Sequence, residues 1–87
     1  MIQQRFNELV TVQLETMDKL LYLQSEIERC QVLEEELIEL QEMTKVESIQ
    51  KEILTKKRDL KEIQKIFQKQ TDEVIRSYQK EQNGVTT

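Results

Sequence analysis

The sequence predicts an all-α protein: an antiparallel two-helix coiled-coil hairpin that dimerises into a four-helix bundle. Three observations predict this fold. The 87 residues include one Gly and no Pro, so the tight turns of a multi-strand sheet cannot be supplied. Apolar residues recur at spacings of three and four, the period of a helix. The two halves also differ in charge: residues 1–43 hold three basic and ten acidic groups, and residues 44–87 hold ten basic and seven acidic groups.

The predicted domain is a single hairpin over residues 1–82. Its first arm covers about 3–42, the turn lies near 43–45, and the second arm covers about 45–82. Thr44-Lys45-Val46-Glu47 matches the Ser/Thr-x-x-Glu capping box, which marks the start of a helix. Asn83-Gly84 is the stop signal, because Gly readily takes the left-handed conformation after a last helical turn. We expect the remaining 83–87 to form a disordered tail.

The second half carries a heptad-like apolar stripe. One row repeats every seven residues, and a complementary row lies three residues further along. Lys56, Gln70 and Ser77 interrupt that second row. The first row contains Val46, Ile53, Leu60, Phe67 and Val74, and the second contains Ile49 and Ile63.

The first half carries two overlapping apolar series, which indicates a helix that touches more than one neighbour. One series is Phe6, Val10, Leu14, Met17 and Leu21, and the other begins with Leu20, Leu23, Ile27 and Cys30 and ends at Met43. Burial of such residues contributes roughly 1.5–3 kcal/mol each. We predict that the interaction seam consists of Leu14, Met17, Leu21, Ile27, Leu37, Ile53, Leu60, Ile63, Phe67 and Val74.

The charge difference favours an antiparallel alignment of the arms. A fold near residues 43–44 sets position i level with about 87−i, which brings Glu26 near Lys61 and Phe6 near Tyr78. An unbroken helix in an antiparallel homodimer aligns the same residues between two chains, so the sequence leaves this domain-swapped arrangement open.

The residue inventory excludes most site chemistry. The chain has no His and one Cys, so the usual zinc, haem and Ser-His or Cys-His sites cannot be assembled. We expect no catalytic residue, no metal ligand and no cofactor. The acidic run 34–36 points in three directions around a helix, and Cys30 lies in an apolar series typical of a core position. Gln24-Ser25-Glu26-Ile27-Glu28 departs from the Ser-Gln-Glu-Leu-Asp signature of small helical-hairpin phosphatases.

The predicted function is therefore a non-enzymatic protein–protein interaction module. Its partner is itself, as a homodimer or higher oligomer, or another helical protein. The N-terminus lacks a secretory signal and no segment approaches the roughly 20 apolar residues of a membrane span, so we expect a cytoplasmic protein. One alternative is a basic amphipathic binder of anionic lipid or nucleic acid, with nucleic acid disfavoured by the net charge of −4. Another is a small helical regulator or phosphatase of a phosphorylated signalling partner.

Three stretches carry a family resemblance. They are residues 13–21 (QLETMDKLL), 24–31 (QSEIERCQ) and 70–78 (QTDEVIRSY). Together they resemble the YgaB-like family of small, uncharacterised proteins from Bacillus and its relatives, over most of the chain. The resemblance implies a bacterial, cytosolic origin. It transfers no catalytic or ligand-binding residue.

Overall fold

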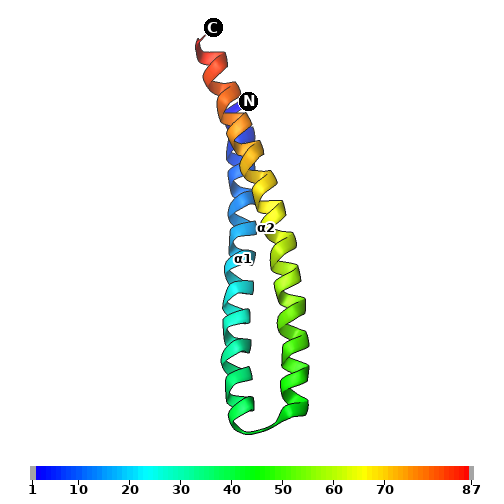
Figure 1. The fold of residues 1–87 in the computed structure, drawn as a ribbon. Coiled ribbons are helices and arrows are strands. Elements are labelled where there is room, and N and C mark those ends of the chain that lie inside the picture. Colours follow the sequence, from blue (N-terminus) through cyan, green and yellow to red (C-terminus); the bar gives the residue numbers. More distant parts are fainter. Residues whose placement is uncertain (1, 87) are drawn as a thin grey trace.

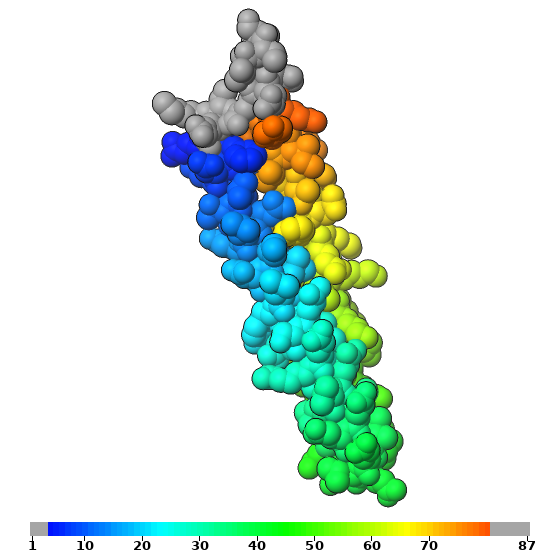
Figure 2. Space-filling model, turned by 90° about the vertical axis from the view of Figure 1, so that its left-hand side faces the viewer, coloured from blue at the N-terminus to red at the C-terminus, as the bar shows by residue number. Residues whose placement is uncertain are grey.

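The computed structural model is an antiparallel helical hairpin (Figure 1). It describes the backbone of residues 2–86 and the side chains of residues 4–80. Helix α1 runs from Ile2–Glu39 and helix α2 from Met43–Thr86, and residues 2–86 contain no strand. The molecule measures 68 × 14 × 14 Å between its outermost Cα positions. Figure 2 shows an elongated body in which the two helices stay side by side. The predicted hairpin is thus confirmed.

The turn lies at residues 40–42, earlier than the predicted 43–45. Two hydrogen bonds close the end of α1: the Gln41 amide donates to the Ile38 carbonyl and the Glu42 amide to the Leu37 carbonyl, both at 3.0 Å. This pair of bonds is the Schellman motif, whose C′ residue takes a left-handed conformation. Gln41 occupies that position, with φ of 59°.

Helix α2 begins directly after this cap. The Glu42 carbonyl accepts the Val46 amide at 3.0 Å, so Glu42 is the N-cap residue. Thr44 is consequently the second residue of α2 and is exposed, instead of capping it. At the other end, the backbone of α2 passes Asn83-Gly84 and continues to Thr86, into the segment expected to be a disordered tail.

The helices meet along a regular heptad seam. The predicted second-half rows occupy it: the apolar row fills the a positions, and the row interrupted by Lys56, Gln70 and Ser77 fills the d positions. Every a and d residue between 6 and 37 and between 46 and 77 is buried or half-buried. In α1 these residues are Phe6, Leu9, Gln13, Thr16, Leu20, Leu23, Ile27, Cys30, Glu34 and Leu37.

Burial is deepest near the turn. Cys30, Ile49 and Ile53 form the buried core cluster, and Leu37 packs against it. The seam residues nearer the open end of the hairpin are half-buried, apart from buried Thr16. The tight turn holds the two helices together at one end, so the apolar contacts that define the alignment are concentrated there.

The pairing register follows from the earlier turn. Gln13 contacts Thr71 across the helices, and the Phe6 and Tyr78 rings lie 6.2 Å apart between centroids. Position i is therefore level with about 84−i in these contacts, instead of 87−i. Glu26 consequently pairs with Lys56. The predicted pairing of Glu26 with Lys61 is wrong.

Candidate functional site

The predicted seam residues divide into two groups. Seven of them lie in the hairpin seam, where Ile27 and Ile53 are buried and the others are half-buried. The other three, Leu14, Met17 and Leu21, are 55%, 41% and 55% exposed, more than any residue of the seam. The half-buried group contains Leu37, Leu60, Ile63, Phe67 and Val74.

Polar residues occupy seam positions in the part of α1 where Leu14, Met17 and Leu21 are predicted to face α2. The buried Thr16 hydroxyl donates to the Val12 carbonyl at 3.2 Å, and the Gln13 amide donates to the Thr71 hydroxyl. Within the described structure, the buried Gln70 Oε1 has no hydrogen-bond partner. The heptad phase set by the core at the turn continues along α1, and it brings these polar residues to the seam.

A charged cluster lies at the edge of the seam. Lys56 Nζ lies 3.2 Å from Glu52 Oε1 on its own helix and 3.8 Å from Glu26 Oε2 on the facing helix. Arg29 also pairs with Glu26, at 3.0 Å. The hydrogen bond to Glu52 raises the pKa of Lys56 above its usual value; desolvation opposes this shift, and the charges of Glu52, Cys30 and Glu26 add to it. The ammonium form of Lys56 is therefore the form that the folded hairpin favours.

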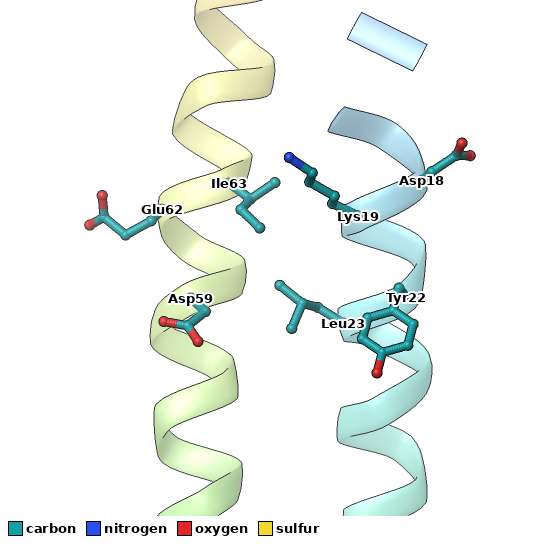
Figure 3. A pocket seen from close by; sticks show the side chains of 7 residues that line it. All are labelled: Asp18, Lys19, Tyr22, Leu23, Asp59, Glu62 and Ile63. Carbon is teal, nitrogen blue, oxygen red and sulfur yellow. The ribbon is translucent and has the colours of Figure 1, made fainter. Parts of the chain in front are cut away.

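A groove of about 560 Å³ opens halfway along the hairpin (Figure 3). Leu23 and Ile63 point toward each other between the helices and form its floor, and Lys19 reaches toward α2. Asp18 and Glu62 point outward on opposite sides. The remaining lining residues are Tyr22 and Asp59.

The groove has an apolar floor and a mostly acidic rim, across which Lys19 extends. Its carboxylates diverge, and among the described residues no group of three or more Cys, Asp or Glu side chains is arranged to hold a metal ion. Within that same part of the chain, neither helix contains a segment long and apolar enough to cross a membrane.

A second surface lies on the opposite side of the seam. Leu14, Met17 and Leu21 occupy b and e positions of α1, whereas the groove residues Lys19 and Asp59 occupy g positions. In an antiparallel pair the e positions of both helices flank one side of the seam and the g positions flank the other. We define the open-end face by the b and e residues within 7–24 and 64–78; the next b residue of α2 toward the turn is Lys61. The face consists of Asn7, Val10, Leu14, Met17, Leu21, Gln24, Gln64, Gln68, Thr71, Ile75 and Tyr78.

The open-end face contains no charged residue, although 34% of the whole chain is charged. Leu14, Met17 and Leu21 were singled out from the sequence, but as members of the hairpin seam. Ile75, 48% exposed, was not singled out, because it stands apart from the heptad rows of its helix. The signal present in the sequence was the 3–4 spacing of a second apolar series beside the seam.

Cys30 is buried and has a free thiol. It contributes to the core cluster with Ile49 and Ile53, in agreement with its place in the apolar series. A small, polarisable side chain at this d position packs against the facing helix.

Comparison with known proteins identifies related sequences. The family model for YgaB-like protein matches residues 5–81. The Uncharacterized protein YgaB of Bacillus subtilis (strain 168) is 52% identical over 73 residues. This alignment covers 84% of the chain and 64% of that protein, so the chain spans less than two thirds of its relative's length. No solved structure matches the chain.

Proposed function

We propose that this chain, which belongs to the YgaB-like family, acts as a non-enzymatic helical module that binds a second copy of itself or another helical protein in the cytoplasm. One observation carries the proposal: the open-end face leaves Leu14, Met17 and Leu21 exposed at the spacing of a helix-packing seam. Contiguous exposed apolar residues of this kind mark interaction surfaces.

The balance of buried and exposed apolar residues supports the same proposal. Among residues 4–80, five apolar residues are buried, and fourteen large apolar residues are exposed. Ten further apolar residues are half-buried, so the hairpin covers about half of the apolar side chains in residues 4–80 and leaves the other half exposed. Cys30 is a free thiol and forms no disulfide, which is compatible with a reducing compartment such as the cytoplasm.

The alternative of a basic surface binder draws support from the ten basic residues of the second half. It requires α2 to present its cations to phosphates, and in the hairpin Lys56 lies between two carboxylates. The alternative of a regulator or phosphatase rests on Ser25 and Gln24, which are both exposed on α1. The described contacts bring no acid–base pair together with the Ser25 hydroxyl. We therefore favour the interaction module.

Photo-crosslinking in cells tests the proposal. A benzophenone amino acid in place of Leu14 is expected to give covalent protein adducts on illumination, and the same substitution at Thr55, which is exposed and lies outside the open-end face, is expected to give none. The proposal fails if position 14 gives no protein adduct and the purified chain instead binds anionic vesicles or DNA at low salt.

A further inference from the structure

We infer that the open-end face binds the same face of a second copy of this chain, and that the two hairpins lie antiparallel with their turns at opposite ends. This inference rests on the proposed function and deepens it by naming the partner. It also describes the dimer more narrowly than a four-helix bundle over the full length, because the helices of the two copies meet only along the open-end halves.

The charge distribution selects the occupant. The chain has a net charge of −4, so two copies repel each other at most approaches. The open-end face is a region where two copies meet without bringing like charges together, because its eleven residues are uncharged. The nearest charged b residue, Lys61, lies at the edge of the face toward the turn. Interface cores are depleted of charge and enriched in Met and aromatic residues, and this face includes Met17 and Tyr78. A positively charged partner could form no ion pair with the residues of this face.

The shape of the face fits pairing with itself. Val10, Leu14, Met17 and Leu21 follow each other at spacings of four, three and four, which is the spacing of a coiled-coil seam. This second seam adjoins the first, because Val10 is half-buried at the edge of the hairpin contact. A helix with two adjacent apolar seams is typical of four-helix bundles, in which each helix contacts two neighbours.

The turn half of the same side determines the orientation. This side is acidic next to the turn, where Glu35, Glu42 and Glu47 lie, whereas Glu28 lies level with Lys57 further along. Parallel stacking would bring the three carboxylates next to the turn beside the same three of the second copy. An antiparallel arrangement, with the two-fold axis between Leu14 and Met17, moves the two acidic ends far apart. Such an isologous contact buries the same patch on both copies.

Sedimentation equilibrium tests the occupant. We expect the full chain at about 100 µM to have twice the 10.5 kDa mass of one chain. Leu14→Glu is expected to restore the mass of a single chain. Val12→Glu is the matched control, because Val12 is 48% exposed only two residues away but occupies a g position on the groove side. This control is expected to stay dimeric.

Circular dichroism establishes that each variant is folded, and Leu21→Gln provides a second, uncharged disruption of the face. A dimer that survives Leu14→Glu and Leu21→Gln but dissociates on Val12→Glu would overturn the inference. A chain that is monomeric before any substitution would overturn it as well. If the chain is monomeric, photo-adducts of position 14 with a different protein would still support the proposed function. If no such adducts form either, both the proposed function and the inferred dimer are wrong.

Spin-label distances test the orientation. A label at Glu47, in a Cys30→Ala background, lies about 20 residues from the proposed two-fold axis. At a rise of about 1.5 Å per residue, the antiparallel arrangement predicts roughly 60 Å between the two labels. The parallel arrangement places the turns together and predicts a distance below about 25 Å, so a short distance would overturn the proposed orientation.

Discussion

The rings of Phe6 and Tyr78 lie 6.2 Å apart between centroids, with 49° between their planes. Seventy-two positions separate them in the sequence, so this contact at the open end exists because the chain reverses at Gln41. The tilted geometry is one that aromatic pairs prefer. It shows that the two helices remain paired close to the end that lies furthest from the turn.

This contact distinguishes a hairpin from two continuous helices that exchange their arms. Spin labels at the exposed Asn7 and Gln79, in a Cys30→Ala background, are expected to lie less than about 25 Å apart, a few helix diameters at most. Dilution with a tenfold excess of unlabelled chain should leave the distance distribution unchanged. If the short distance disappears on dilution, the pairing is between chains and the hairpin is wrong.

The turn is expected to gain stability from a glycine. Gln41 has a left-handed backbone with φ of 59°, which costs a residue with a Cβ atom about 1 kcal/mol. Gln41→Gly should therefore raise the free energy of unfolding by about 0.5–1 kcal/mol in urea titrations at fixed protein concentration. Gln41→Val should lower it. Equal stability of the three proteins would show that the Schellman motif is absent in solution.

The seam is expected to gain stability when its unpaired amide is removed. Gln70 Oε1 is buried without a hydrogen-bond partner in the described structure, and an unsatisfied group of this kind costs about 1–3 kcal/mol. Gln70→Leu should raise the free energy of unfolding by about 1–2 kcal/mol. Gln79→Leu, at an exposed f position outside the open-end face, is the control and should change it by less than about 0.5 kcal/mol. A loss of stability in Gln70→Leu would contradict the seam assignment.

The apolar row of α2 is expected to tolerate no charge. Leu60 is half-buried at an a position, so Leu60→Asp should reduce helicity and lower the free energy of unfolding by about 2–3 kcal/mol. Leu54 lies on the same helix and is 63% exposed, so Leu54→Asp should have a much smaller effect. Thermal melting by circular dichroism compares the two. An unchanged melting curve in Leu60→Asp would show that this row does not form the seam.

The Lys56 cluster predicts a loss of stability in alkaline solution. The pKa of Lys56 is raised in the folded chain, first by its hydrogen bond to Glu52, so the folded state binds this proton more tightly than the unfolded state. Its contribution is fully present below the usual lysine pKa of about 10.4 and is lost as the pH rises through the higher folded value. The stability difference between the natural chain and Lys56→Met should be constant from about pH 7 to 9 and should change above about pH 10.5. A difference that is flat across the whole range would exclude this cluster as a source of stability.

The sequence by itself determined the two helical arms, their antiparallel alignment and the seam positions of the second half. The seven-residue row through Leu60 has a single apolar phase, so only one face of that helix can be buried, and the interruptions at Lys56 and Gln70 still lie in register with it. Opposite charges on the two halves also agree with the antiparallel pairing. These features depend on local periodicity, which can be read from one helix without the position of the facing helix.

Only the tertiary structure decided where the chain turns and which series of the first half faces inward. The turn depends on Gln41 in a left-handed conformation, and composition does not reveal this because Gln is uncommon there. In the open-end half of α1, Leu14 and Met17 lie outside the seam, while Gln13 and Thr16 face α2. The physical reason is continuity of a rigid helix: once Ile27 and Cys30 are buried near the turn, the heptad phase of the whole helix is determined.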